Sequence, residues 1–449
     1  MPDESMCTAG KPSSRVAQIA RLAPDRAKCN IGAGFNVNAK CNFGVRRRRI
    51  MAATGGPPLA GVRVVELGNI IGGPYAGMLL ADMGADVVKV EPPGGDLARG
   101  FGPYVDGVSY YFAAINRGKR SLAVDPRSPL AAPWVRRLCV TADVVLHNLR
   151  HGAMERMGLG CDDLLAENPR LVYAEVSAFG STGPDAARAG IDILFQGESG
   201  MMSITGDEGG PPAKTATTVG DYLAGTNAAL AVCAALFRRQ STGEGGRVDI
   251  SLRDGLVAIQ SSWNAMFFAD GIQPARVGTG SWFTAPTATF ATSDGHLNLA
   301  IVSDRHFEIL CDELGLDLAE RPEYATNELR VQHRSELEAA VSEALAGDTT
   351  EAWLERMHGR GLPAGRILDL PEVFDDPQVR HNRMRVELAH PRRGPVPVTG
   401  SPVQVDREPA VAGRPPPELG EHTREVLREI GAADAEIEAL IAEGAAVSG

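Results

Sequence analysis

The chain has 449 residues, a formal net charge of −11 and a hydrophobic fraction of 44%. This length suffices for two or three domains with sizeable cores, while the negative charge and the low aromatic fraction of 5% argue against a surface that binds nucleic acid. The longest apolar run, residues 227–237, is too short to cross a bilayer, and no two of the seven cysteines form a CxxC pair that would indicate a disulfide framework or a zinc site.

The first fifty residues differ from the rest of the sequence. They carry ten Lys and Arg against three Asp and Glu, without apolar periodicity. They also lack the apolar stretch of a secretory signal. We therefore predict that residues 1–57 are a disordered or misassigned N-terminal extension, with Met51 as the working start of the protein.

From residue 60 onward, short apolar strands alternate with helical segments. The pattern predicts strands at 62–67, 85–90, 121–124, 143–146, 171–176 and 248–252. Helices are predicted at 75–83, around 134–138, near 164–167 and from 223 to about 239. Such alternation is typical of an α/β fold, so we expect a large Rossmann-like domain over residues 58–264, with a parallel sheet covered on both faces.

The character of the sequence changes after about residue 265. A stretch rich in Gly, Thr and Pro is followed by helical segments, which predicts a smaller α+β domain over residues 265–385; its helices are expected at 304–315, 335–346 and 350–359. Beyond it, residues 386–409 favour strands, and a last helix is predicted at 423–430 with Thr423 as its N-cap. We expect residues 386–449 to return to the large domain.

The turn after the first strand bears on nucleotide binding. Glu91 closes the second strand, about where an NAD enzyme places its ribose-binding carboxylate. The turn itself reads Gly68-Asn-Ile-Ile-Gly-Gly rather than G-x-G-x-x-G, and its two isoleucines stand where a pyrophosphate needs bare backbone. The sequence therefore disfavours NAD chemistry.

Two aspartates are candidates for catalysis. Asp221 opens the most apolar helix and lies between Gly220 and Gly225, which would let a substrate approach closely. One interpretation is that Asp221 caps the helix and has a purely structural role. The other is that the helix N-terminus holds the pKa of Asp221 at or below the ordinary value, so that the ionised carboxylate can act as a nucleophile. Asp192 lies in an apolar run, and a buried acid usually has a partner or a function. Spacing alone leaves these alternatives open.

Several motifs occur in order along the chain, at residues 59–67, 73–96, 116–122, 142–150, 155–160, 168–173, 220–221 and 419–423. With them, residues 58 to about 430 resemble the family III CoA-transferases, or CaiB/BaiF family, which includes formyl-CoA:oxalate CoA-transferase and α-methylacyl-CoA racemase. The resemblance implies ring-shaped chains interlocked in a homodimer. It also implies a cytoplasmic enzyme that takes a coenzyme A thioester and a small carboxylic acid as substrates, without a metal, a tightly bound cofactor, a membrane or a nucleic acid partner.

The resemblance places the catalytic carboxylate of the transferases on Asp221. That carboxylate would attack the acyl-CoA thioester to form an aspartyl mixed anhydride and then an aspartyl-CoA thioester. The implied CoA-binding positions are Ile70, Ile71, Gly72, Val124, Arg127, Asn148 and Arg156. The implied neighbours of the catalytic residue are Ile191, Asp192, Tyr222 and, in a short candidate lid at 277–281, Gly278 and Gly280. Formyl-CoA transferase has an arginine near the adenine at the position directly after Glu91, and this chain has Pro92 at that position. The resemblance leaves Arg99 as the candidate to replace that contact with the adenine.

The choice between transferase and racemase depends on the residue before Asp192. Racemases of this family carry a histidine there, and this chain has Ile191. Because isoleucine cannot move a proton, we favour CoA transfer over 2-methylacyl-CoA racemisation; a non-catalytic CoA-binding protein is a third alternative. We interpret His147 and His151 as structural or surface residues. Ile191 also suggests an acceptor acid other than oxalate.

Overall fold

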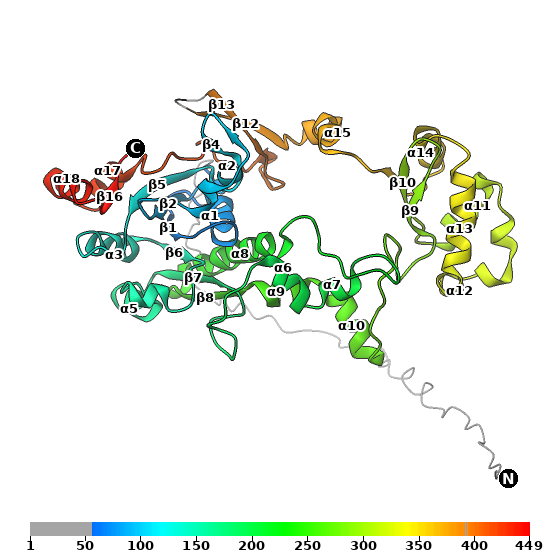
Figure 1. Ribbon diagram of the computed structural model, residues 1–449, viewed down its shortest axis with the longest axis horizontal. Coiled ribbons are helices and arrows are strands. Elements are labelled where there is room, and N and C mark those ends of the chain that lie inside the picture. Colours follow the sequence, from blue (N-terminus) through cyan, green and yellow to red (C-terminus); the bar gives the residue numbers. More distant parts are fainter. Residues whose placement is uncertain (1–55, 391, 393) are drawn as a thin grey trace, which may run out of the picture. The chain divides into compact units, whose positions relative to one another are not determined.

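The computed structural model describes residues 56–390, 392 and 394–449. The predicted N-terminal extension, with the proposed start at Met51, lies outside the described residues except for its last two positions. Among the described residues, the region from Arg63 onward alternates strands and helices as the sequence predicts (Figure 1).

A seven-stranded sheet carries the fold, in the order β16-β5-β2-β1-β6-β7-β8. Six strands are parallel to their neighbours: β1 Arg63–Leu67, β2 Asp86–Glu91, β5 Lys119–Val124, β6 Val144–His147, β7 Val172–Ser177 and β8 Gly246–Ser251. Each lies within two residues of its predicted position, so the parallel sheet is confirmed. The two-residue strand β16, Ala446–Val447, pairs antiparallel with β5 and was not predicted.

Helices cover both faces of this sheet because successive strand residues point to opposite sides. Val65 joins a core formed with one set of helices, namely α3 Ala132–Thr141, α5 Cys161–Glu167, α17 Thr423–Glu429 and α18 Asp434–Ala442. Val64 joins a second core, whose helices are α1 Gly72–Asp82, α6 Asp192–Glu198, α8 Val219–Thr242 and α9 Leu252–Ile259. The fold is therefore an α/β layered structure with a mainly parallel sheet.

Helix α8 is the longest in the described part of the chain. It spans 24 residues, more than the apolar run seen in the sequence, and is long and apolar enough by length and composition to cross a membrane. Its side chains Ala228, Val232 and Leu236 are instead buried in the core against the sheet. A Cβ on Gly225 would come within 2.8 Å of the Gly72 carbonyl oxygen, so only glycine lets α8 pack this closely on α1.

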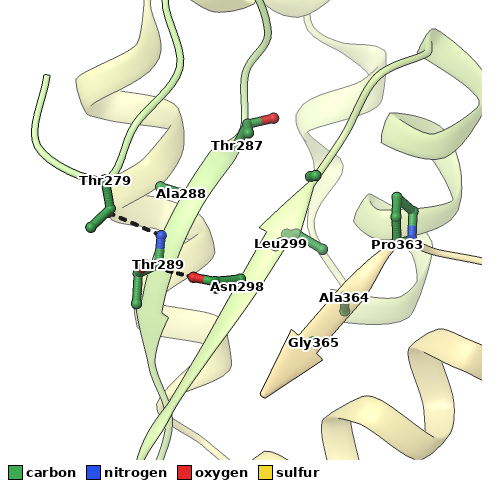
Figure 2. A pocket seen from close by; sticks show the side chains of 10 residues that line it. Thr279, Thr287, Ala288, Thr289, Asn298, Leu299, Pro363, Ala364 and Gly365 are labelled. Carbon is green, nitrogen blue, oxygen red and sulfur yellow. Dashed lines mark hydrogen bonds between the residues drawn. The ribbon is translucent and has the colours of Figure 1, made fainter. Parts of the chain in front are cut away.

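Residues 285–364 form a core of their own around an antiparallel sheet of β9 Thr287–Ala291, β10 His296–Ala300 and β11 Ala364–Arg366. Helices α11 Asp304–Leu314, α12 Asn327–Gln332, α13 Arg334–Leu345 and α14 Thr350–Gly359 accompany it; α11, α13 and α14 were predicted. A pocket of about 550 Å³ lies on this sheet, and Thr289 Oγ1 donates to Asn298 Oδ1 there over 2.7 Å. Figure 2 shows the side chains that line it. Its lining side chains are uncharged.

The last part of the chain contains the predicted strands and more. Two hairpins, β12 Arg385–His390 with β13 Gly394–Thr399 and β14 Gln404–Val405 with β15 Glu408–Pro409, occupy the proline-containing segment. The prediction that Thr423 caps α17 is wrong: His422 is the N-cap, and the Thr423 hydroxyl accepts the Ala123 N–H. Helix α18 was also missed.

Shorter elements connect these parts. They are η1 Leu97–Gly100, β3 Tyr104–Val105, β4 Val108–Ser109, α2 Tyr110–Asn116, α4 Ala153–Arg156, α7 Met201–Ile204, α10 Ser261–Asp270, η2 Asp317–Glu320, η3 Pro322–Tyr324, α15 Leu370–Asp375 and α16 Pro377–His381.

Candidate active site

Asp221 lies in the first turn of α8. Thr218 occupies the N-cap position and makes no side-chain hydrogen bond there, so Asp221 is not the cap that the sequence suggested. Asp192, at the start of α6, supplies the missing acceptor: its Oδ1 accepts the Gly220 N–H over 2.7 Å. A Cβ on Gly220 would lie 2.8 Å from that oxygen, so glycine is needed for this contact. The buried Asp192 therefore has a structural partner, the amino end of α8.

The Asp221 carboxylate has unusual surroundings. It is half-buried, and no hydrogen-bond donor or cation within the described ranges contacts it. Burial, together with the charge of Asp192, raises the pKa of Asp221 from 3.8 to about 7. The expectation that the helix N-terminus would keep this pKa low is wrong, because desolvation of the carboxylate outweighs the helix dipole.

The flanking glycines do not open Asp221 to substrate. Gly220 and Gly225 are buried, and both serve close packing inside the protein. Access comes instead from a cavity of about 530 Å³ that Asp221 lines. Gly72 also lines this cavity beside the carboxylate, since a Cβ on Gly72 would lie 3.7 Å from Asp221 Oδ1. The sequence interpretation of these glycines is therefore corrected.

The cavity lies where the carboxyl ends of the parallel strands meet, which is the usual ligand position in such sheets. Segments that follow β1, β6 and β7 contribute to its wall, and so does the segment leading into α6. Six of the predicted site residues line it together: Ile70, Ile71, Gly72, Asn148, Ile191 and Asp221. The side chain of Ile191 is 66% exposed there. The structure thus brings these six residues, from separate parts of the sequence, to one cavity.

Asn148 orders the cavity wall. Its Oδ1 accepts the Asn69 N–H and its Nδ2 donates to the Asn69 carbonyl, each over 2.9 Å. Both ends of the amide are therefore used to hold the loop between β1 and α1. In this arrangement Asn148 fixes the backbone that lines the cavity.

A second cavity, of about 280 Å³, shares Asn69 and Leu149 with the first. It follows the ends of β1, β2 and β5 and includes the predicted residue Arg127, whose exposed side chain pairs with Asp125 over 3.0 Å. The shared residues place the two cavities side by side along the edge of the sheet.

Other predicted residues line neither cavity; they are Val124, Arg156, Asp192, Tyr222, Gly278 and Gly280. Val124 is 1% exposed and lies in the core that the sheet forms with α3, α5, α17 and α18. Arg156 is exposed on α4, and Tyr222 packs edge-on against Tyr75 with ring centroids 4.8 Å apart. Gly278 donates its N–H to the Gly206 carbonyl in a connecting segment.

Arg99 is engaged elsewhere. It donates to both carboxylate oxygens of Glu91 over 2.7 and 2.8 Å, and its guanidinium lies 3.7 Å from the Phe112 ring centroid. These hydrogen bonds hold the pKa of Glu91 below its ordinary value despite its burial. Glu91 is thus neutralised inside the protein and is not presented as a free ribose ligand.

Sequence reasoning missed three basic residues of the cavity: Arg150, His151 and Arg188. Arg188 is paired with Glu198 over 2.9 Å, whereas Arg150 makes no ion pair among the described residues. Of the two histidines set aside as structural or surface, His147 is buried against Tyr173 but His151 is exposed at the cavity. The signal that could have found Arg150 and His151 is their place in the loop that follows the parallel strand β6.

The chain is similar over most of its length to proteins of one known family. Residues 59–423 match CoA-transferase family III. A succinate–glutarate CoA-transferase from Agrobacterium fabrum is 39% identical over 383 residues, which cover 83% of this chain and 96% of that protein. The chain belongs to CoA-transferase family III. The resemblance stated from the sequence motifs is confirmed.

Further relatives of this family III CoA-transferase support the assignment. A succinyl-CoA:glutarate CoA-transferase from Mus musculus is 37% identical over 376 residues, covering 83% of this chain and 86% of that protein. The crystal structure of a CaiB/BaiF family protein from Brucella suis superposes with a TM-score of 0.76 at 36% identity, covering 84% of this chain and all of that one. The enzyme thus transfers CoA between acyl-CoA thioesters and acids.

Among the described residues, no cluster of three His, Cys, Asp or Glu side chains is arranged to hold a metal ion.

Proposed function

We propose that this CoA-transferase moves CoA to a free carboxylic acid by covalent catalysis at Asp221. An Asp221 carboxylate oxygen attacks the thioester carbonyl carbon, the C–S bond breaks, and CoA leaves as a thiolate. The product is a mixed anhydride between Asp221 and the donor acyl group. The thiolate then attacks the aspartyl carbonyl of the anhydride, which releases the donor acid as a carboxylate and leaves an aspartyl-CoA thioester.

The second half of the reaction repeats these steps with the acceptor. The acceptor carboxylate attacks the aspartyl-CoA carbonyl and expels the CoA thiolate, so that a new mixed anhydride forms. The thiolate attacks the acceptor acyl carbonyl, which yields the acceptor-CoA and restores the Asp221 carboxylate. Every nucleophile and leaving group is an anion, so no proton has to be transferred.

One observation carries this proposal: the Asp221 carboxylate lies at the wall of a cavity, and within the ranges that the structure describes no neighbouring donor or cation stabilises it. Its pKa of about 7 reflects a poorly solvated anion. Such an anion is a better nucleophile than a fully hydrated carboxylate, and a partly enclosed site protects an anhydride from water.

The two adjoining cavities support a path for CoA. We propose that the thioester end lies in the cavity of Asp221, against the backbone of Ile70–Gly72. The nucleotide end would extend past Asn69 and Leu149 into the smaller cavity, near Arg127. Asn148 orders this path, and contacts of Val124 and Arg156 with CoA remain predictions.

We propose dicarboxylic acids of four or five carbons as the exchanged acids. The relatives named above act on succinate and glutarate, which belong to this class. The guanidinium of Arg150 at the cavity, without an ion-pair partner in the part of the chain that the structure describes, offers a positive charge for a second carboxylate. The Ile191 side chain offers apolar contact to the carbon chain.

We also propose a cytoplasmic homodimer of interlocked ring-shaped chains, with domains at 58–264, 265–385 and 386–449. Apolar side chains are exposed on two helices: Leu230 and Phe237 on α8, and Phe267 and Phe268 on α10. Phe237 is 81% exposed. A second copy of the chain would remove this apolar surface from water.

The test is CoA transfer from succinyl-CoA to glutarate by the wild-type enzyme and by Asp221→Asn and Asp221→Ala. We expect transfer by the wild type and a loss of at least 1,000-fold in both variants, as a rough order for removal of a nucleophile. Retained transfer in either variant would refute the proposal. Deuterium incorporation at the α-carbon of 2-methylacyl-CoA, without transfer, would indicate the racemase, and binding without either reaction would indicate the non-catalytic protein.

A further inference from the structure

The loop between β1 and α1 forms a wall of the cavity beside Asp221, and its backbone is strained. Ile70 has a φ of +64°, in the left-handed region. A β-branched residue rarely adopts this conformation, because its Cβ crowds the backbone there. Ile70 nevertheless lines the cavity with Ile71 and Gly72. Something outside the loop must therefore hold it.

A buried group of four charged side chains lies directly beneath this loop. Lys89 Nζ lies 2.8 Å from both Glu66 Oε1 and Asp96 Oδ2, and Lys119 Nζ lies 2.7 Å from Glu66 Oε2. All four side chains are 0% exposed. We call this group of Glu66, Lys89, Asp96 and Lys119 the buried charge cluster. It contains two carboxylates and two ammonium groups, so its formal charges balance.

The buried charge cluster holds the loop at three points. Lys89 Nζ donates to the Gly68 carbonyl over 2.7 Å, at the start of the loop. Asp96 Oδ1 accepts the Ile70 N–H over 3.1 Å, at the strained residue. Lys119 Nζ donates to the Pro74 carbonyl over 2.7 Å, in the first turn of α1. The start of the loop, the strained residue and the first turn of α1 are thus all fixed to the same cluster.

Stability alone does not explain such a cluster. Removing four charges from water is costly, and apolar side chains of similar size often give an equally stable core. A fixed backbone at a reacting centre, in contrast, needs directional bonds that apolar packing cannot supply. The position of the cluster under a strained, cavity-lining loop therefore points to a role in the site.

We infer that Asp96 and Lys89 are positioning residues, which hold the Gly68–Gly72 backbone in the conformation that receives the acyl-CoA next to Asp221. This inference rests on the proposed function, since it assigns the loop to the CoA site. Asp96 is the critical member because both of its oxygens are used. Oδ2 faces Lys89, while Oδ1 accepts the N–H groups of Ile70 and Ala98.

The test compares two Asp→Asn variants of matched chemistry. Asp96→Asn leaves a single oxygen, which cannot serve both Lys89 and Ile70. The control is Asp82→Asn, at the far end of α1: Asp82 is buried, uses both oxygens for Arg117 over 2.9 and 2.6 Å, and also accepts the Ala412 N–H. Its hydrogen-bond partners, Arg117 and Ala412, both lie outside the loop.

We measure the Kd for free CoA by calorimetry, KM and kcat for succinyl-CoA, and the urea midpoint of all three proteins. Both variants are expected to lower the urea midpoint of unfolding, because each removes a buried carboxylate from its partners. Asp96→Asn is expected to weaken CoA binding and raise KM by at least 10-fold, whereas Asp82→Asn leaves both within 2-fold of the wild type. Equal effects of the two variants on binding, or an unchanged Kd in Asp96→Asn, would overturn the inference.

A second measurement needs neither a folded variant nor a substrate. Amide hydrogen exchange of the wild type reports the Ile70 N–H directly, and its bond to Asp96 predicts strong protection despite its place in a cavity-lining loop. Exchange at the rate of an unprotected amide would overturn the inference even if Asp96→Asn fails to fold. A wild type that does not bind CoA would refute the proposed function, while the protection of Ile70 would still decide whether the cluster holds the loop.

Discussion

Replacing Asp221 with asparagine is expected to stabilise the protein in neutral and alkaline solution while it removes activity. Folding raises the pKa of this carboxyl from 3.8 to about 7, so the folded state binds a proton that the unfolded state has released. Between these two values, the ionisation of Asp221 costs about 1.4 kcal/mol of folding free energy for each pH unit. Above pH 7 the cost levels off at about 4 kcal/mol. Asparagine has no such cost.

The assay is urea unfolding of the wild type and of Asp221→Asn at pH 5 and pH 8.5. We expect the free energy of unfolding of the variant to exceed that of the wild type at both pH values. The advantage should be larger at pH 8.5 by about 2 to 3 kcal/mol, from the same pKa values. A difference that does not change with pH, or a variant less stable than the wild type at pH 8.5, would refute the account of this carboxylate.

Asp86→Asn serves as the control of opposite sign. Arg120 and Arg63 bond to Asp86 and hold its pKa below the ordinary value even though burial opposes them. A lowered pKa contributes stability above the unfolded value of 3.8, and this stability is lost as the pH falls through the folded pKa. Asp86→Asn is therefore expected to destabilise the protein at pH 8.5. A gain in stability there would show that any Asp→Asn change acts in this way.

Three further predictions follow from the sequence and the site. The rate of CoA attachment to Asp221 in rapid-mixing experiments should rise about 10-fold per pH unit below pH 7 and be flat above it, given the carboxyl pKa of about 7; a pH-independent rate would contradict this. An enzyme that begins at Met51 should match the full chain in urea midpoint and kcat, and a loss of either would show that the first fifty residues contribute. Sedimentation velocity at micromolar concentration should show a dimer, and Phe237→Glu should shift it toward the monomer; a wild type that sediments as a monomer would exclude the homodimer.

The sheet was predictable because buried parallel strands leave a strong local signal. The strand Val144–His147, for example, is buried at every position and apolar at its first three, since helices cover both faces. The strand β16 was not predictable, because its two residues pair with β5 from more than 300 positions away and carry no pattern of their own. The same holds for Thr423, whose hydroxyl bonds across the fold to Ala123 instead of capping its own helix.

The candidate site was predictable in position but not in electrostatics. The motifs located Asp221 and the loop at Ile70, because Asp221 lies in one motif and Ile70 lies in the short turn between two others. The pKa of Asp221 depends on how deeply the folded chain buries it and on how close Asp192 comes, and neither depends on neighbours in the sequence. For the same reason, the sequence assigned the glycines beside Asp221 to substrate access, whereas their role in packing appears only in three dimensions.

The central claim, that Asp221 becomes covalently attached to CoA, can be tested by intact-protein mass spectrometry. The enzyme is incubated with succinyl-CoA without an acceptor acid, quenched in acid, and compared with Asp221→Asn treated in the same way. The account predicts a gain in mass equal to CoA less one water, an adduct that maps to the peptide containing Thr217–Tyr222, its removal by hydroxylamine, and its absence in the variant. An enzyme that turns over succinyl-CoA and glutarate without ever carrying this adduct, or that carries it on another carboxylate, would contradict the account.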